Sequence, residues 1–194
     1  ENYRKAIEAD LPAKQLKKLK AEQFPMLMPA ARFKNGREME HLVSYTTLCQ
    51  CDIDNIPSDI MEEAKRRVRE LPFVVMYHVS MSGHGLHIYY FYQIPNCRLT
   101  PQVYQHAFIQ GNERIANAIP ADYDPAVGKA NHGSSFCHDP EAWFNPDAVP
   151  LKVDMTLNAQ KRSKKDHIAN SSAVTEQMWP AAWTVEKVFA FAQD

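Results

Sequence analysis

Two strand-like runs separated by a four-residue turn constrain the fold of this chain more than any other feature. The runs are "FVVMYHVSM" (73–81) and "LHIYYFYQI" (86–94), both rich in β-branched and aromatic residues. The turn between them, at residues 82–85, holds two of the six glycines of the chain. A connection this short joins antiparallel strands, because parallel neighbours need a crossover of a dozen or more residues. We therefore expect a β-hairpin here.

The segments on either side of the hairpin predict further strands and helices. The run "HLVSYTTLCQCDIDNI" (41–56) is β-branched and aromatic, which is typical of a strand buried on both faces. The run "DIMEEAKRRVREL" (59–71) predicts a helix with Ser58 as its N-cap, acidic residues near its start and basic residues near its end. Thr100 and Pro101 open another helix as N-cap and first residue. The order of strand, helix, hairpin and helix predicts an α+β or α/β sandwich with one main sheet.

The two ends of the chain carry weaker signals. Residues 3–22 have a helical period that is broken near Pro12, and "KVDMTLNAQ" (152–160) predicts one more strand. We expect a main domain at residues 1–155 with a helical lead-in. A basic linker and a C-terminal helix are expected at residues 156–194.

Composition limits the class of protein. The 194 residues are 45% hydrophobic and 23% charged, as in a globular domain that buries a sizeable core. The formal net charge is −1, so any basic surface for a nucleic acid must be local. No stretch approaches the roughly 18 apolar residues of a membrane helix, and no signal-peptide pattern is present. We therefore expect no membrane partner. The four cysteines lack CxxC spacing, so we expect a cytoplasmic protein with reduced thiols and no structural zinc.

The stretch "CQCDIDNIP" (49–57) carries the most informative polar residues. Asp52 and Asp54 stand two apart on an apolar strand, so their side chains project from the same face. At about 5–7 Å they repel, and each raises the pKa of the other unless a cation lies between them. A divalent ion removes this conflict, and Mg²⁺ combines one or two carboxylates with phosphates and water. The alternative is a strand end without chemistry, where Asp54 and Asn55 start a turn towards Pro57.

The hairpin turn and the strand after it offer a second candidate site. Gly83 and Gly85 let the backbone approach a ligand closely or adopt a positive φ. Ser82 and the neighbouring amides suit an anion-binding concavity. Because side chains alternate along a strand, His87 opens one face beside the turn, within reach of a phosphate and outside the mid-core. The alternative is a turn followed by a core histidine. His84 has no assigned role, and the turn matches neither a P-loop nor a Rossmann fingerprint.

Together, "LCQCDIDNI" and "SMSGHGLHIYYFY" resemble two motifs of the archaeo-eukaryotic primase superfamily, the catalytic domains of primases and primase–polymerases. The first motif of that family is an apolar strand that ends in Asp-x-Asp or Asp-x-Glu. The second is a Ser-x-His-type motif at a glycine-rich turn entering a strand. More specifically, the flanking "LKKLKAEQFPMLMPAARFKNG" and "HDPEAWFNPDAVP" are similar to the VirE N-terminal-type domain of Bacteroidetes mobile elements. The resemblance covers about residues 10 to 150.

The third motif of the family is a hydrophobic residue followed by an acid. Tyr123 and Asp124 are the best match, and Asp139 in "SFCHDP" is the rival. Where the family leads us to expect an arginine, this chain has "GKANHGSSF", in which Lys129 or His132 is the substitute.

The resemblance implies an α+β fold with an RRM-like antiparallel sheet that carries the three motifs on one face. It implies that Asp52, Asp54 and Asp124 are catalytic and hold two Mg²⁺ or Mn²⁺ ions. The implied binding residues for a nucleoside triphosphate are Ser82, Gly83, Gly85, His87 and Lys129. The implied activity is a DNA primase/polymerase-like nucleotidyltransferase acting on single-stranded DNA in mobile-element replication, with a helicase-like domain or protein as partner. The alternatives are a nucleic-acid- or nucleotide-binding module without catalysis, linked to a helicase, and a two-metal nuclease using the same aspartates.

Other residues suit nucleic-acid binding less specifically. The basic runs "KRRVR" (65–69) and "KRSKK" (161–165) have the charge to follow a phosphate backbone, although solvated faces are the commoner explanation. Tyr89, Phe91 and Tyr92 have the rings to stack on bases, but aromatic residues on a buried strand usually belong to the core.

Overall fold

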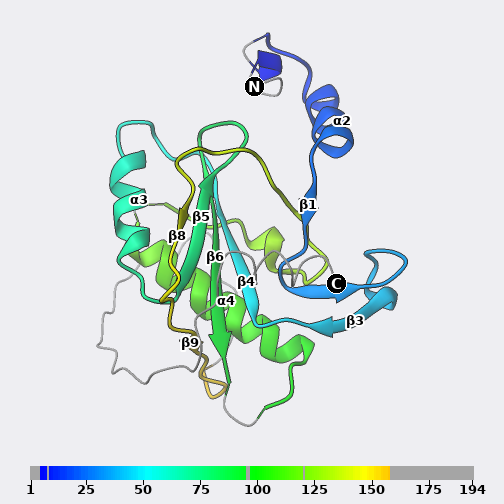
Figure 1. Cartoon of the computed structure of the whole chain (residues 1–194), viewed down its shortest axis with the longest axis vertical. Helices are drawn as coiled ribbons and strands as arrows, with labels where there is room; N and C mark the ends of the chain where they lie inside the picture. Colours follow the sequence, from blue (N-terminus) through cyan, green and yellow to red (C-terminus); the bar gives the residue numbers. More distant parts are fainter. Residues whose placement is uncertain (1–4, 8, 95–96, 120, 158–194) are drawn as a thin grey trace.

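The centre of the molecule is a mainly antiparallel sheet (Figure 1). The computed structural model describes residues 5–7, 9–94, 97–119 and 121–157. The sheet order is β4 (Leu48–Ile53), β6 (Leu86–Gln93), β5 (Val74–Val79) and β8 (Trp143–Phe144). A short strand, β9 (Leu151–Lys152), pairs with β6 in the parallel direction. With its helices the domain is α+β, and the predicted hairpin of β5 and β6 is confirmed.

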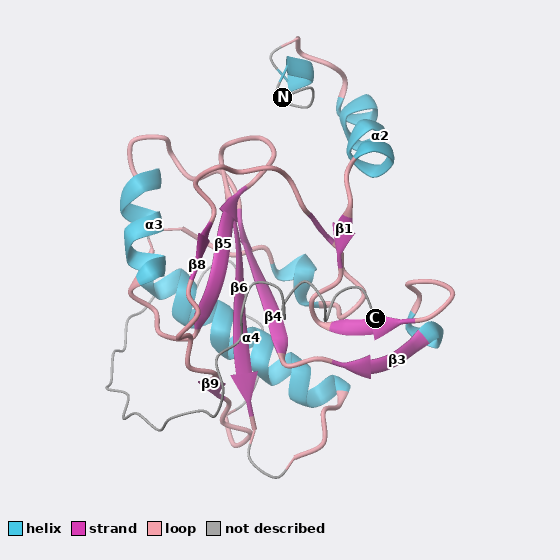
Figure 2. Cartoon of the chain, viewed as in Figure 1, coloured by secondary structure: helices cyan, strands magenta, loops and turns pink. Residues whose placement is uncertain are grey.

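Helices cover one face of this sheet. The helix α4 (Pro101–Ala118) lies behind β4 and β6 in Figure 2, and α3 (Met61–Arg69) lies beside β5. Tyr90 on β6 donates hydrogen bonds from its hydroxyl to two carbonyl oxygens of α4. A Cβ atom on Gly111 would lie 2.2 Å from the Tyr90 ring, so the glycine lets α4 lie close against β6. Leu86, Ile88 and Tyr90 therefore share the helix-covered face, and His87 and Tyr89 project from the opposite face, as predicted.

Two small ladders lie on the side of β4 that is away from β5 (Figure 1). One pairs β1 (Met26–Leu27) with β7 (Ser134–Ser135), and the other pairs β2 (Ala31–Phe33) with β3 (Leu42–Tyr45). The remaining elements are α2 (Ala13–Gln23) and two 3-10 turns, η1 (Met39–His41) and η2 (Pro125–Gly128). Pro12 is the N-cap residue of α2, which agrees with the predicted break there.

The prediction of one continuous strand over residues 41–56 is wrong. The chain changes partners at Thr46, because β3 pairs with β2 whereas β4 pairs with β6. The Thr46 amide donates to Ala30 O at 3.0 Å, and its hydroxyl donates to Pro29 O. These contacts bend the strand towards β2. Burial on both faces holds for β4 but not for β3, where Val43 is 62% exposed.

The predicted starts of the two long helices have different outcomes. Ser58 is not the N-cap of α3, because the Ile60 amide donates to Pro57 O at 3.1 Å and forms a turn that delays the helix to Met61. Thr100 caps α4 as predicted, since its side chain accepts from the Val103 amide at 3.2 Å.

The predicted basic linker and C-terminal helix lie outside the described residues, and the division at residue 155 stays a prediction. The four cysteines are free. Within the described ranges, no helix has the length and apolar character needed to span a membrane.

Candidate acidic and histidine site

Asp52, His87 and His78 form a row across three adjacent strands. Asp52 on β4 is the register partner of His87 on β6, which is also the partner of His78 on β5. Side chains directly opposite each other in antiparallel strands share a face, with Cβ atoms about 4.5–5.5 Å apart. The imidazole centroids of His78 and His87 are 4.9 Å apart. The sheet therefore gathers an acid and two imidazoles, all buried, on the face opposite α4.

The glycine turn packs against the end of β4, which carries the carboxylate pair. A Cβ atom on Gly85 would lie 2.5 Å from Ile53 O and 3.4 Å from Asp54 Cα. The Ile56 amide donates to His84 O at 2.8 Å, which fastens the turn to the same segment. Gly85 is therefore needed for a close approach to the backbone of the chain itself, where the sequence led us to expect an approach to a ligand.

Ser82 and Gly83 shape the tip of this turn. Gly83 has a φ of 84°, in the left-handed region that glycine adopts readily. The Ser82 hydroxyl lies 3.1 Å from Ser80 Oγ and accepts from the His84 amide at 3.4 Å. No hydrogen bond joins Ser82 to His87 in the part of the chain that the structure describes. The turn thus lies beside Asp54, and His87 lies farther along β6, opposite Asp52.

Asp124 lies beside the predicted carboxylate pair. Its amide donates to Asp52 O at 2.8 Å, and Tyr123 forms a β-bridge with Ile53. The pKa of Asp52 is raised to about 7, mainly by burial and in smaller part by the charges of Asp54 and Asp124. Three acids from two distant segments therefore interact.

Asp139, the rival third acid, has a different position. Its Oδ2 accepts from the Val79 amide at 2.7 Å, and its Oδ1 accepts from the Glu141 amide at 3.0 Å. These bonds fix the loop that follows β7 to the end of β5. Asp139 therefore lies at the end of β5, whereas the Asp124 amide lies next to Asp52 O. Asp124 also accepts a local hydrogen bond, from the Ala126 amide to its Oδ1 at 2.9 Å.

Orphaned polar atoms lie on the same face of β4. Asp52 Oδ1 is buried and has no hydrogen-bond partner among the described residues. Gln50, two residues earlier, is 1% exposed, and both its Oε1 and its Nε2 lack a partner there. Because buried polar groups are nearly always hydrogen-bonded, these atoms point to a water, an ion or a ligand as their partner. Gln50 was not predicted as a site residue. The pattern that could have indicated it is a polar residue in the middle of an otherwise apolar, buried strand.

His87 is buried, so the expectation that it lies outside the mid-core is wrong. It is 6% exposed, and its Nδ1 lies 2.9 Å from the Ser134 hydroxyl. The pKa of His87 is lowered to about 3, mainly by burial and in smaller part by the neighbouring His78. The physical reason is the ladder of β1 and β7, which brings Ser134 onto this part of the sheet. The row is thus part of the core.

Basic residues surround the acids. The charge of Lys20, on α2, lowers the pKa of Asp52 and of His87, so α2 contributes a cation that no motif predicts. Burial lowers the pKa of His132, which the charge of Asp124 counteracts. The charge of Lys129, an exposed residue, also acts on His132. Of the two predicted substitutes for an arginine, His132 therefore interacts with the third acid, and Lys129 interacts with His132.

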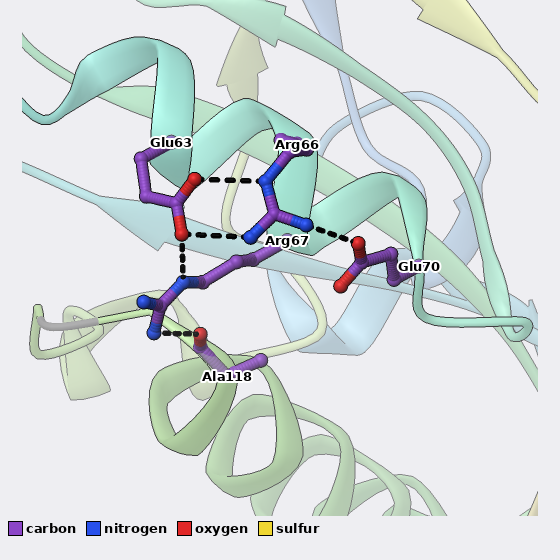
Figure 3. Close-up of polar contacts among 5 residues, drawn as sticks. All are labelled: Glu63, Arg66, Arg67, Glu70 and Ala118. Carbon is purple, nitrogen blue, oxygen red and sulfur yellow. Dashed lines mark hydrogen bonds and ion pairs between the residues drawn. The ribbon is translucent and has the colours of Figure 1, made fainter.

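Two arginines of the basic run on α3, Arg66 and Arg67, pair with acids of the chain segment 63–70 (Figure 3). Glu63 accepts hydrogen bonds from Arg66 at 2.8 Å and from Arg67 at 2.6 Å. Arg66 also pairs with Glu70, and Arg67 donates to Ala118 O at 3.3 Å. Arg66 and Arg67 therefore lie on a solvated, structural helix face, whereas Lys65 of the same run is buried and pairs with Glu62 and Glu141.

The aromatic residues predicted as base-stacking candidates belong mostly to the core. Tyr89 and Tyr92 are each 1% exposed, and the Tyr92 hydroxyl donates to Thr46 O at 2.8 Å. The core explanation, which the sequence favours, is therefore confirmed for these two rings, because neighbouring segments cover them.

The His, Cys, Asp and Glu side chains of the described ranges form no group of three that is placed to hold a metal ion. The charges of Asp54 and Asp124 both act on Asp52, and these acids do not form a closed ligand set in the described residues.

The fold and the site define an α+β domain with a buried aspartate–histidine row beside further carboxylates. The family model described as "BT4734-like, N-terminal domain" matches residues 18–144, which is well over half of the chain. The chain therefore belongs to the BT4734-like N-terminal domain family. The matched segment includes the three acids, His87 and Ser134. No curated protein and no solved structure matches the chain.

Proposed function

We propose that this domain is a metal-dependent nucleotidyltransferase of primase–polymerase type that acts on single-stranded DNA in the replication of a mobile element. The observation that carries the proposal is the gathering of Asp52, Asp54 and Asp124 at the end of β4, with His87 directly opposite Asp52. These residues come from three separate segments of the chain. They are the residues that the resemblance to the primase superfamily singles out.

The topology supports the finer proposal of an RRM-like core and of membership in the archaeo-eukaryotic primase superfamily. The chain order is β4, α3, β5, β6 and α4, followed by the segment of Tyr123. In the sheet, Tyr123 bridges β4, and β6 lies between β4 and β5. This corresponds to a β-α-β-β-α-β arrangement with the last strand beside the first. Here the bridge of Ile53 and Tyr123 takes the place of the last strand.

The donor set suits a hard divalent cation. Asp52 Oδ1 is a buried carboxylate oxygen without a partner in the described ranges, and Mg²⁺ and Mn²⁺ favour carboxylate oxygens. Asp52, Asp54 and Asp124 would hold two Mg²⁺ or Mn²⁺ ions. When bound, these ions activate the primer 3′-hydroxyl and neutralise the leaving pyrophosphate. The three acids do not form a closed ligand set in the described residues. Their side chains would therefore move towards one another when an ion binds.

The nucleoside triphosphate would lie between the acids and the basic residues near them. His87 and the Ser82 end of the turn would bind its phosphates, because Gly85 holds the turn against Asp54. The Gly83 and His84 amides already donate within the turn, to Ser80 O and Ser82 Oγ. Lys129 and Lys20 would contribute positive charge. A helicase-like domain or protein is the proposed partner.

A nucleotide- or nucleic-acid-binding module without catalysis, linked to a helicase, is the second candidate. The observation that favours it is the open ligand set around Asp52. A two-metal nuclease that uses the same aspartates is the third candidate.

One assay set separates the three candidates. The protein is incubated with primed or unprimed single-stranded DNA, NTPs or dNTPs, and Mg²⁺ or Mn²⁺, and the products are resolved by gel electrophoresis. We expect primer extension or primer synthesis, which Asp52→Asn abolishes with its circular dichroism unchanged. The matched control is Asp59→Asn, an exposed acid before α3. Full synthesis by Asp52→Asn would contradict the proposal. DNA retardation without product would favour the binding module, and cleavage would favour the nuclease.

A further inference from the structure

We propose that Ser134 and Tyr89 hold His87 in the neutral tautomer that carries its proton on Nε2, so that Nε2–H is the donor offered to a ligand. The identity of the ligand as a nucleotide phosphate rests on the proposed function. The tautomer is a property of the resting protein and is measurable without any ligand.

The hydrogen bonds of Ser134 define where the protons lie. Tyr89 donates from its hydroxyl to Ser134 Oγ at 2.9 Å, and Ser134 Oγ lies 2.9 Å from His87 Nδ1. Ser134 is 1% exposed, so the single proton of its hydroxyl needs an acceptor within the protein. In the described part of the chain, His87 Nδ1 is the acceptor available to it. Nδ1 is therefore unprotonated, and a neutral ring carries its proton on Nε2.

His78 supports the direction in which Tyr89 donates. His78 Nδ1 lies 3.0 Å from Val79 O, which only accepts, so Nδ1 carries the proton and Nε2 is an acceptor. The Tyr89 hydroxyl is 3.4 Å from His78 Nε2 and 2.9 Å from Ser134 Oγ, so the serine is the nearer acceptor. Burial lowers the pKa of both histidines, which keeps the two rings neutral at pH 7.

The position of Ser134 depends on the N-terminal part of the chain. Ser134 pairs with Leu27 in the ladder of β1 and β7, so residues about a hundred positions apart set the serine over β6. A histidine whose one nitrogen is held by a hydrogen bond has a fixed ring orientation and a fixed tautomer. Because a phosphate oxygen only accepts hydrogen bonds, the Nε2–H tautomer is the neutral form that offers it a donor at Nε2. Ser134 and Tyr89 are thus positioning residues that act through His87.

Nuclear magnetic resonance of protein labelled with ¹⁵N in its histidines tests the tautomer directly. We expect the His87 signals of the ligand-free protein to report a protonated Nε2 and an unprotonated Nδ1, assigned by their loss in His87→Asn. In Ser134→Ala we expect a mixture of the two tautomers. The control Ser135→Ala, the adjacent buried serine, should leave the His87 signals unchanged. A wild-type His87 that is charged or protonated on Nδ1 would overturn the inference.

Steady-state kinetics test whether the tautomer matters for the nucleotide. His87→Gln places an amide nitrogen near the Nε2 position, whereas His87→Asn places one near Nδ1. We expect the KM for the nucleotide to rise about threefold in His87→Gln and about tenfold or more in His87→Asn, the loss of one hydrogen bond. Ser134→Ala should raise KM several-fold with little change in kcat, and should have no further effect in the His87→Asn background. An equal effect of Ser134→Ala in both backgrounds would show a purely structural serine and overturn the positioning role.

The two proposals fail in different ways. If wild-type protein neither binds nor uses nucleotides, the proposed function fails, and the resonance measurement still decides the tautomer. If nucleotides are used and the wild-type ring is protonated on Nδ1, the positioning role fails while the proposed function stands.

Discussion

Asp52 on β4 lies directly opposite His87 on β6 in the antiparallel register of the two strands. The pKa of the acid is raised to about 7 and the pKa of the imidazole is lowered to about 3, with burial as the main cause of both. Burial disfavours the charged form of each group, so the shifts have opposite signs. The sheet thus holds an acid and an imidazole that both favour the neutral form, and a bound cation would reverse this preference for Asp52.

The raised pKa of Asp52 predicts a pH-dependent gain in stability for Asp52→Asn. The folded state keeps the Asp52 proton up to about pH 7, whereas the unfolded chain releases it near pH 4, so the free energy of unfolding falls across that window. The free energy of unfolding of Asp52→Asn should not fall in this way, because the asparagine amide does not titrate in this pH range. We expect it to exceed wild type by about 2 kcal/mol or more at pH 8, with no such gain at pH 4.

Urea unfolding between pH 4 and pH 9 measures this difference. The lowered pKa of His87 makes stability rise with pH between about 3 and 6.5, but that rise is common to both proteins and cancels in the comparison. Asp59→Asn is the matched control. A difference between Asp52→Asn and wild type that stays constant with pH would contradict the burial of Asp52.

Divalent ions should stabilise the folded protein through Asp52. At pH 8, millimolar Mn²⁺ or Mg²⁺ should raise the melting temperature of wild type, because the ion binds the folded state and not the unfolded chain. Chelation should reverse the rise. Asp52→Asn should show no rise beyond that produced by equal ionic strength of a monovalent salt, and an equal rise in both proteins would argue against this site.

Replacement of Gln50 by methionine should stabilise the protein. Both amide atoms of Gln50 are buried without a partner in the described ranges, and removing such atoms relieves a desolvation cost of about 1–2 kcal/mol. The contrasting control is Asn112→Leu. Asn112 Oδ1 also lacks a partner in the described ranges, but Nδ2 donates to Gln50 O, Phe108 O and the Tyr90 hydroxyl. Because these bonds outweigh one orphaned atom, the loss of Asn112 should cost about 2–3 kcal/mol. Denaturant unfolding measures the free energy of unfolding of both variants. A Gln50→Met variant less stable than wild type would contradict the claim that the Gln50 amide is buried without a partner.

Gly85→Ala should displace the glycine turn from the carboxylate strand. Its Cβ would lie 2.5 Å from Ile53 O, a backbone atom that moves only with the strand, so we expect a cost of about 1–3 kcal/mol and weaker nucleotide binding. Gly133→Ala is the control, because its Cβ would meet the flexible Met26 side chain. Equal losses of stability in the two variants would show that the approach to β4 is not the cause.

Local patterns predicted much of this fold. The hairpin of β5 and β6 follows from two β-rich runs and a short turn, and α4 follows from the Thr100 cap. The break at Thr46 was missed because its cause is a contact with Pro29 and Ala30, which no local pattern reports. The cap at Ser58 failed for a related reason, since the turn after Pro57 takes its place.

The candidate site was predicted where it depends on strand spacing and missed where it depends on distant segments. Asp52 and Asp54 follow from their spacing, but only the hydrogen bond from the Asp124 amide to Asp52 O separates Asp124 from Asp139. The burial of His87 depends on Ser134, and the ladder that brings this serine to the sheet joins two remote segments.

Calorimetric titration with a non-hydrolysable nucleoside triphosphate, with and without Mn²⁺, tests the central claim most directly. The claim is that Asp52 and the acids beside it hold a divalent ion that helps His87 bind a triphosphate. We predict that wild type binds the triphosphate at least tenfold more tightly with Mn²⁺ than without it, and that Asp52→Asn loses this dependence while Asp59→Asn keeps it. Nucleotide binding that is equal with and without Mn²⁺, or a dependence that Asp52→Asn retains, would contradict the claim.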